Sequence, residues 1–186
     1  MLQEYRHLEG SRIITRDPSV LLIEAVEDCA RFSLRIAEGG ITLASEAFGC
    51  DLPKVIGATT ASGARLALCL GPDEWQLLAP LGERDAIEAQ FAALYPDCPH
   101  SLVDVSHREV GISIEGTAAA LALRSACPLD LGDMAVGTAT RTIFDKAQII
   151  LIRDGENRFR IEVWRSFADH VWGILQAAGR EIALGI

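Results

Sequence analysis

The fold is decided by two stretches that share one pattern: LALCLGPDEWQLLA, residues 66–79, and IILIRDGENRFRIEV, residues 149–163. In each stretch an apolar run meets a turn that contains glycine, and apolar residues then fall on alternate positions. A period of two residues on either side of such a turn is typical of a β-hairpin. The sequence therefore predicts two similar hairpins. The alternating residues are Trp75, Leu77 and Ala79 in the first hairpin and Phe159, Ile161 and Val163 in the second.

A helix with one apolar side is predicted after each hairpin. Apolar residues recur there at i, i+4, i+7 and i+8, which places them on one face that can cover a sheet. Ser166 is expected to cap the second helix, with Asp169 three residues later in a shortened capping box. The apolar stripes are Ile87, Phe91, Leu94 and Tyr95 in the first helix and Phe167, Val171, Ile174 and Leu175 in the second.

The likeness between the two halves extends upstream of the hairpins. Residues 31–53 and residues 109–130 each show a strand, a small turn, an Ala-rich helix and then a cysteine beside a Leu–Pro or Pro–Leu break. We therefore expect an α+β fold of two tandem β-α-β-β-α units, with helices packed on antiparallel or mixed sheet. The expected division is an N-terminal extension over 1–29, a first unit over 30–100 and a second over 101–186, together forming one compact globule.

Composition narrows the class of protein. The chain has 186 residues, 49% hydrophobic and 23% charged, which is ordinary for a globular domain. Its formal net charge of −9 argues against nucleic acid, because phosphates require a basic surface. No uncharged apolar run reaches the ~18 residues of a membrane span. The first twenty residues hold no apolar signal-peptide core, so we expect a cytoplasmic protein without a membrane partner.

Five cysteines lie at positions 29, 50, 69, 98 and 127. The number is odd and no pair forms C-x-x-C, so we expect reduced thiols rather than a disulfide framework. Cys127 in CPLDL is a weak candidate nucleophile, since it follows a predicted helix at the negative end of the helix dipole. Cys50 takes the same place in the first unit, and a duplicated residue favours a structural role.

The stretch SLVDVSHREVG, residues 101–111, holds Asp104, Ser106, His107 and Arg108 close together. On a strand Asp104 and Ser106 would point to one face and His107 to the other, so Ser106 and His107 are poorly placed to pair. No G-x-S-x-G elbow presents the serine. We expect this stretch to link two strands, with its polar residues bonding backbone groups or contacting a partner.

Sites for metals and dinucleotides are not indicated. The histidines at 7, 100, 107 and 170 lack H-x-x-x-H and H-E-x-x-H spacing, and no G-x-G-x-x-G follows a strand.

The stretch VWRSFADHVW is a candidate interface, because Trp164, Arg165 and Trp172 flank the last predicted helix. Trp and Arg are enriched at interface hot spots, although Trp164 closing the core beside a solvated Arg165 fits the sequence as well.

Five segments together resemble one family, the gamma subunit of heterotetrameric sarcosine oxidase. They lie in order between residues 70 and 175, whereas the first ~30 residues show no such match. The family is similar to the folate-binding domain of the glycine-cleavage T protein, which agrees with the duplicated pattern. The segments are LGPDEWQLL (70–78), VDVSHREVGISIEG (103–116), CPLDL (127–131), RTIFDKAQIILIRDG (141–155) and FRIEVWRSFADHVWGIL (159–175).

This resemblance implies an accessory subunit that assembles with alpha, beta and delta subunits. The complex would oxidise sarcosine to glycine, form peroxide and pass the one-carbon unit to tetrahydrofolate. FAD, FMN, NAD and folate would be bound by the larger subunits, leaving this chain with no catalytic, cofactor-binding or metal-binding residue. The candidate docking residues are then His107, Arg108, Trp164 and Arg165.

Several alternatives stay open from the sequence. A stand-alone folate-binding or aminomethyl-transfer protein would need a carboxylate aimed into a central pocket, and related transferases are much longer. A small hydrolase using Ser106 or Cys127 is disfavoured by the geometry above. The sequence also leaves open a related N-methyl amino acid as substrate, self-association of the isolated chain, the docking face and a residual folate pocket.

Overall fold

The computed structural model describes residues 8, 10–15 and 17–185. It confirms the α+β class, with helices packed on two antiparallel sheets. The chain forms two compact units. Unit 1 comprises residues 1–27, 108–136 and 141–186, and unit 2 comprises residues 28–107 and 137–140.

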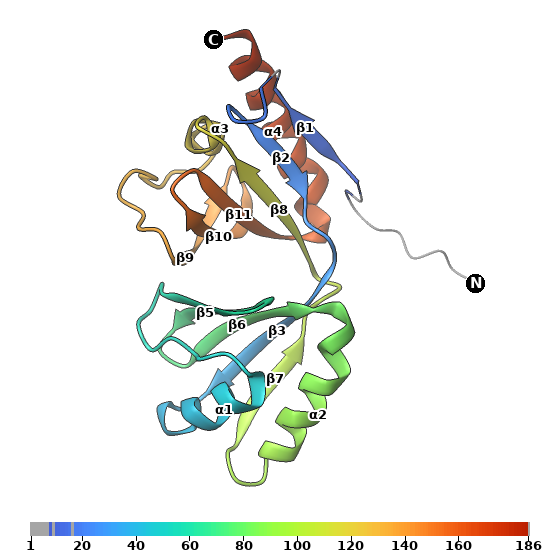
Figure 1. The fold of residues 1–186 in the computed structure, drawn as a ribbon, viewed down its shortest axis with the longest axis vertical. Helices are drawn as coiled ribbons and strands as arrows, with labels where there is room; N and C mark the ends of the chain where they lie inside the picture. Colours follow the sequence, from blue (N-terminus) through green and yellow to red (C-terminus); the bar gives the residue numbers. More distant parts are fainter. Residues whose placement is uncertain (1–7, 9, 16, 186) are drawn as a thin grey trace, which may run out of the picture. The chain divides into compact units, whose positions relative to one another are not determined.

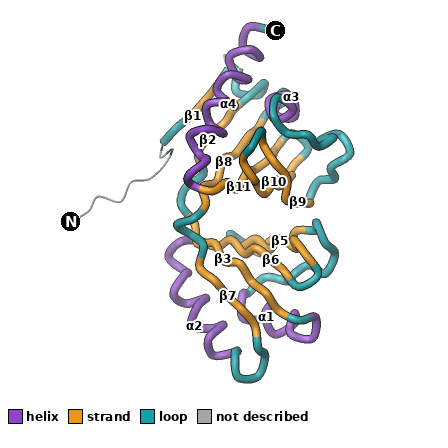
Figure 2. Tube along the Cα trace, turned by 180° about the vertical axis from the view of Figure 1, so that it is seen from behind, coloured by secondary structure: helices purple, strands orange, loops and turns teal. Residues whose placement is uncertain are grey.

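Unit 2 is built on a five-stranded sheet with the order β4-β5-β6-β3-β7. Every neighbouring pair is antiparallel. Helices α1 and α2 contact each other and lie on the same side of this sheet (Figure 1), and the view from behind shows the same arrangement (Figure 2). The elements are β3 (Cys29–Ile36), α1 (Ile41–Phe48), β4 (Thr59–Ser62), β5 (Arg65–Gly71), β6 (Glu74–Pro80), α2 (Arg84–Leu94) and β7 (His100–Asp104), with short 3-10 turns at Glu38–Gly40 and Leu81–Glu83.

Unit 1 is built on a six-stranded antiparallel sheet with the order β1-β2-β8-β11-β10-β9. Helices α3 and α4 contact each other, and both pack against β11. None of the helices in the described residues is long and apolar enough to cross a membrane. The elements are β1 (Arg12–Ile14), β2 (Leu22–Ala25), β8 (Glu109–Glu115), α3 (Ala119–Arg124), β9 (Thr138–Phe144), β10 (Ala147–Gly155), β11 (Arg158–Trp164) and α4 (Arg165–Leu184).

The two predicted hairpins are confirmed, and they share an irregularity. In β5–β6 the register shifts between Cys69 and Gly71. In β10–β11 it shifts between Arg153 and Gly155. A β-bulge at the same distance from the turn in both hairpins is a local feature that a chance likeness of two strand pairs would not reproduce. In each unit, one strand that the sequence pattern did not predict pairs with the first strand of the hairpin. This strand is β4 in unit 2 and β9 in unit 1.

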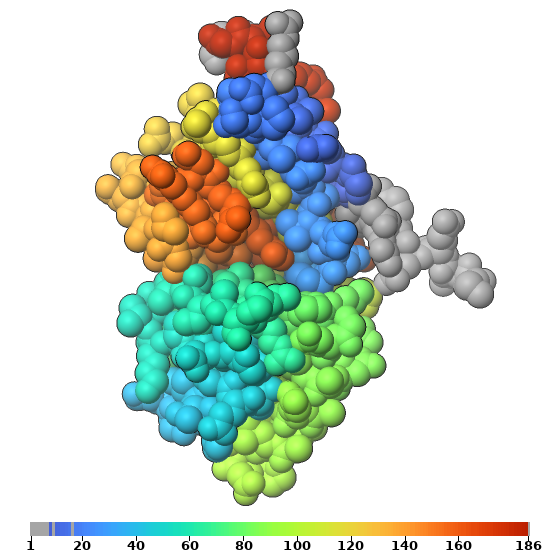
Figure 3. All heavy atoms as spheres, in the orientation of Figure 1, coloured from blue at the N-terminus to red at the C-terminus, as the bar shows by residue number. Residues whose placement is uncertain are grey.

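The strand before each repeat joins the sheet of the other repeat. β2 precedes β3 in the chain but pairs with β8, and β7 precedes β8 but pairs with β3. The chain therefore passes from one sheet to the other at residues 26–28 and returns at 105–108. Residues 10–25, expected to lie in an extension, instead supply two strands of unit 1. Figure 3 shows their blue atoms beside the yellow atoms of β8 and α3.

Each unit has its own apolar core between helices and sheet. In unit 2 the predicted stripe of α2 buries Ile87 and Phe91. Tyr95 lies just past the helix end and is 56% exposed, so its predicted place in the stripe is wrong. In unit 1 α4 buries Val171 and Leu175 completely, as its spacing predicts. Both cores consist of side chains brought in from sheet and helices together.

The start of α4 differs from the prediction. Its N-cap is Trp164, in extended conformation, and no side chain caps the helix. Ser166 is an exposed residue of the first turn, so its predicted role as N-cap is wrong. The backbone N–H of Arg165 instead donates a hydrogen bond to the carbonyl oxygen of Arg108 at 2.8 Å. The carbonyl oxygen of Arg108, in the turn before β8, thus satisfies one of the N–H groups at the helix start that have no partner within the helix.

Candidate functional site

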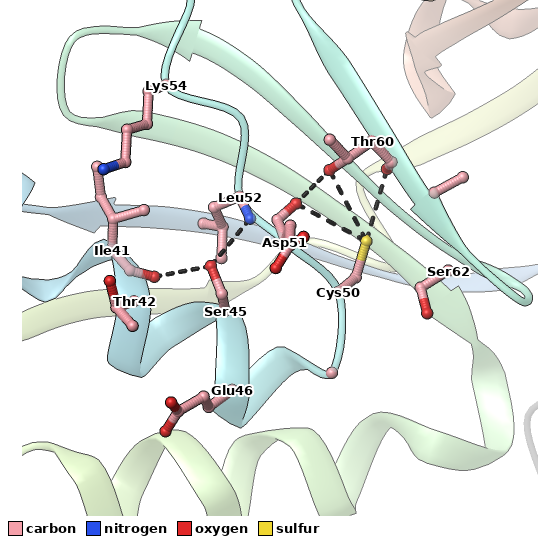
Figure 4. A pocket seen from close by; sticks show the side chains of 12 residues that line it. Ile41, Thr42, Ser45, Glu46, Cys50, Asp51, Leu52, Lys54, Thr60 and Ser62 are labelled. Atoms are coloured by element: carbon pink, nitrogen blue, oxygen red, sulfur yellow. Dashed lines mark hydrogen bonds between the residues drawn. The ribbon is translucent and has the colours of Figure 1, made fainter.

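A pocket of about 720 Å³ lies in unit 2, beside α1 and β4. One face of α1, the loop after it and the strand β4 line it (Figure 4). The lining combines polar and apolar surface in about equal parts. The residues are Ile41, Thr42, Ser45, Glu46, Gly49, Cys50, Asp51, Leu52, Lys54, Thr60, Ala61 and Ser62.

Three polar side chains of this pocket, those of Ser45, Cys50 and Thr60, are bonded within the chain. The Ser45 hydroxyl donates to the carbonyl oxygen of Ile41 at 2.8 Å and accepts from the backbone N–H of Leu52 at 2.9 Å. The Thr60 hydroxyl donates to the carbonyl oxygen of Asp51, and the Cys50 thiol lies 3.6 Å from the carbonyl oxygen of Thr60. Figure 4 shows the Ser45 bonds within α1 and to the loop after it, and the bonds from Cys50 and Asp51 of that loop to Thr60 of β4. These bonds thus hold the loop in place.

The serine of the sequence DVSHRE is part of a backbone-supporting network. Ser106 is 6% exposed, and its hydroxyl donates to Asp104 Oδ1 at 2.5 Å. The same hydroxyl oxygen accepts the buried backbone N–H of Arg31 at 2.9 Å. As a donor the Ser106 hydroxyl bonds Asp104 at the end of β7, and as an acceptor it ties the turn between β7 and β8 to Arg31 of β3. This agrees with a linking segment whose polar residues bond backbone groups. His107 is exposed in that turn.

The cysteines are free thiols, all of them within the described residues. Cys50 and Cys127 are 5% and 6% exposed, and each follows the Ala-rich helix of its unit. Cys69 is 1% exposed, and burial raises the pKa of its thiol. A buried thiol with a raised pKa is a poor nucleophile, so Cys69 is a core residue.

The structure brings one histidine together with a carboxylate that the sequence analysis did not single out. His170 Nε2 lies 2.7 Å from Asp145 Oδ2. The hydrogen bond from His170 lowers the pKa of Asp145. Asp145 sits in the turn between β9 and β10 with φ of 53°, a left-handed conformation that Asp adopts more readily than most residues. Among the described residues no group of three or more His, Cys, Asp or Glu is arranged to hold a metal ion.

The residues at the start of α4 form an aromatic and cationic cluster. Trp164 ends β11 and is 45% exposed. The guanidinium carbon of Arg108 lies 5.5 Å from the centre of the Trp164 ring, within cation–π range. Arg108 Nη2 also lies 2.9 Å from Oε1 of Glu109, whose side chain is only 4% exposed.

Arg165, the next residue, is partly buried, and its Nε is buried without a hydrogen-bond partner. The structure thus brings together Arg108, Trp164 and Arg165, three of the four residues singled out from the sequence. Glu109 was missed, although its place directly after Arg108 was a signal. We call Arg108, Trp164 and Arg165 the docking cluster.

Comparison with known proteins places these observations in one family. Residues 37–181 match the model of the sarcosine oxidase, gamma subunit family. The chain is 35% identical over 135 residues to sarcosine oxidase subunit gamma of Corynebacterium sp. strain P-1, covering 71% of this chain and 66% of that protein. It is 31% identical over 173 residues to the subunit gamma of Corynebacterium sp. strain U-96, covering 90% and 80%.

Solved structures agree at the level of the fold. A chain of heterotetrameric sarcosine oxidase from Corynebacterium sp. U-96, in complex with pyrrole 2-carboxylate, is similar with a TM-score of 0.80 and 28% identity, covering 91% of this chain and 88% of that one. The glycine cleavage system aminomethyltransferase T from Bartonella henselae is similar with a TM-score of 0.64 at 13% identity, covering 82% and 44%. The second likeness is one of fold alone.

Proposed function

The chain belongs to the sarcosine oxidase gamma subunit family, and on this premise we propose that it is the accessory gamma subunit of a heterotetrameric sarcosine oxidase. Its partners would be the alpha, beta and delta subunits. The assembled enzyme would demethylate sarcosine to glycine oxidatively, form peroxide and transfer the one-carbon unit to tetrahydrofolate. The observation that carries this proposal is the match, along 91% of this chain, to a chain of an intact heterotetramer.

We assign this chain a structural role within the complex. FAD, FMN, NAD and tetrahydrofolate would be held by the larger subunits. Two observations support the assignment. The hydroxyl of Ser106 is committed to Asp104 and Arg31, and the Ser45 and Thr60 hydroxyls of the pocket beside α1 are bonded to backbone groups. The hydroxyls of Ser106, Ser45 and Thr60 are thus used in holding the fold.

Docking is assigned to the docking cluster, with His107 exposed in the turn that leads to Arg108. Trp164 is exposed and Arg108 lies over its ring, and Trp and Arg are both enriched among the residues that carry most of the binding energy at protein interfaces. Trp164 ends β11 and Arg165 begins α4, while Arg108 lies in the turn before β8 and its carbonyl oxygen accepts a hydrogen bond from the backbone N–H of Arg165.

Reconstitution tests this function. The native complex is isolated with and without this chain, and peroxide formation from sarcosine is measured in both preparations. We expect the chain to co-purify with the flavin-containing subunits and to raise the yield or lifetime of the active complex. Replacing Ser106, His107 or Cys127 with Ala should leave turnover per flavin unchanged once the complex is assembled. A chain that stays separate from the flavoprotein, or a variant that assembles fully and fails to turn over, would contradict the assignment.

A further inference from the structure

We infer that Arg165 binds a carboxylate of a partner subunit, with the exposed ring of Trp164 flanking that contact. The inference rests on the proposed function, because it names the chemistry that the partner brings to the docking cluster. It starts from a donor that the chain leaves unsatisfied.

Among the described residues, Arg31 and Arg165 each have one buried guanidinium nitrogen without a hydrogen bond. They differ in the rest of the side chain, because Arg31 has other partners and Arg165 has no side-chain partner. Of the described residues, six arginines are partly or fully buried, and five of them have a hydrogen-bond or ion-pair partner. Arg165 has a buried Nε without one. The five partnered contacts are Arg31 with Cys29 O (3.1 Å), Arg65 with Glu83 (2.7 Å), Arg84 with Asp85 (3.0 Å), Arg153 with Leu131 O (3.0 Å) and Arg160 with Glu162 (2.5 Å).

A partly buried guanidinium needs an acceptor more than a neutral group does. Arginine stays protonated at any pH a protein meets, so Arg165 cannot escape the loss of water by becoming neutral. Its buried N–H has given up water without a replacement, which costs free energy in the isolated chain. Only Nε is buried, and the Arg165 side chain is otherwise partly exposed, so an acceptor on a partner can reach the outer part of the guanidinium. A carboxylate matches the planar fork of a guanidinium with two parallel hydrogen bonds, which makes it the strongest such acceptor in proteins.

The neighbours of Arg165 favour Arg165 over Arg108 as the anchor for that carboxylate. Arg108 is already paired with the buried Glu109 carboxylate at 2.9 Å and stacked over Trp164. Its charge is thus partly used inside the chain, whereas that of Arg165 is not. The remaining charge of the molecule is strongly negative, with a formal net charge of −9. An acidic segment of a partner would be repelled by most of this surface and attracted to the docking cluster, which sets its orientation.

Binding measurements on single variants test this contact. Full-length chains are titrated into the assembly of the other three subunits, and the dissociation constant is measured at two salt concentrations. We expect R165A to weaken binding at least tenfold and R165K to fall between R165A and the unchanged chain. The salt dependence should be smaller for R165A, because an ion pair has been removed. R180A is the matched control, since Arg180 is an exposed arginine of the same helix, and it should bind unchanged.

The melting temperature of each isolated variant separates docking from internal support. R165A should melt at the same or a higher temperature, because it removes an unsatisfied donor rather than a bond. Carbodiimide treatment of the R165K complex should then join the new amine to an Asp or Glu of the partner, located by peptide mass spectrometry, while R180K should give no such product. Weaker binding at an undiminished melting temperature, together with this cross-link, supports the inference.

The measurements separate a failure of the proposed function from a failure of the carboxylate contact. If the unchanged chain does not bind the other subunits, the proposed function falls, and the inference falls with it. If the unchanged chain binds and R165A binds equally well, the carboxylate contact alone is overturned. A clear drop in the melting temperature of R165A, or a cross-link confined to this chain, overturns it too, because Arg165 would then be an internal support.

Discussion

At the scale of single residues, Ser106 shows how a side chain of catalytic type serves the backbone. Its hydroxyl joins Asp104 to the buried N–H of Arg31, 75 positions away along the chain. Ser106→Ala should therefore lower the free energy of unfolding by about 1–3 kcal/mol, the cost of leaving that N–H unbonded. Ser166→Ala is the control, since Ser166 is exposed and caps nothing, and it should change stability by less than ~0.5 kcal/mol. Urea unfolding of both variants checks this; equal effects would contradict it.

The pair Asp145 and His170 gives a residue-scale prediction about pH. The hydrogen bond from His170 depresses the pKa of Asp145 below its ordinary value of 3.8. A carboxyl with a depressed pKa adds stability that is fully present above pH ~4 and is lost as the pH falls through the folded pKa. Asp145→Asn should therefore remove part of the acid sensitivity, and Asn tolerates the left-handed φ at this position. Unfolding curves at pH 7 and pH 3 measure the effect; an acid response identical in both proteins would count against it.

At the scale of elements, the start of α1 depends on one close approach. A Cβ at Gly40 would lie 2.4 Å from Cys98 Sγ and 2.7 Å from Ile36 Cδ1, so both neighbours would have to move. Gly40→Ala should destabilise unit 2 by about 1–3 kcal/mol, as overpacking of a core does. Gly39→Ala is a matched control, because nothing lies within 4 Å of its added methyl group. Melting temperatures of the two variants decide; if they shift equally, the packing at Gly40 is not the cause.

The elements also show what periodicity predicts and what it leaves out. Both hairpins and the apolar face of α4 were predicted, because their alternation and helical spacing are long and regular. β4 was missed, since Thr59–Ser62 is short and polar and gains its place by pairing with β5. β2 was missed because its partner, β8, lies about 90 residues away. The residues proposed for docking stood out by type alone, but the unsatisfied Nε of Arg165 depends on tertiary packing that no local pattern reveals.

At the scale of the whole molecule, the first two strands in the chain, β1 and β2, belong to the sheet of unit 1. The other strands of that sheet, β8 to β11, come from the second half of the chain. Leu21 and Ile23 are fully buried in the core of unit 1, and β2 covers one edge of β8. Deleting residues 1–27 should therefore abolish cooperative folding of unit 1, whereas deleting residues 1–7 removes none of the described structure. Thermal melting followed by circular dichroism would show the difference. Two truncated chains with the same transition would show that the sheet does not need its N-terminal strands.

The exchange of β2 and β7 between the two sheets has a consequence for how such a chain folds. A protein made of one repeat would have no fifth strand of its own and would have to obtain it from a second copy, as domain-swapped dimers do. Its stability would then follow the protein concentration by mass action. With both repeats in one polypeptide, the donor strand is always present at the high effective concentration set by the short tether. Because both repeats lie in one chain, pairing of the exchanged strands does not depend on the protein concentration.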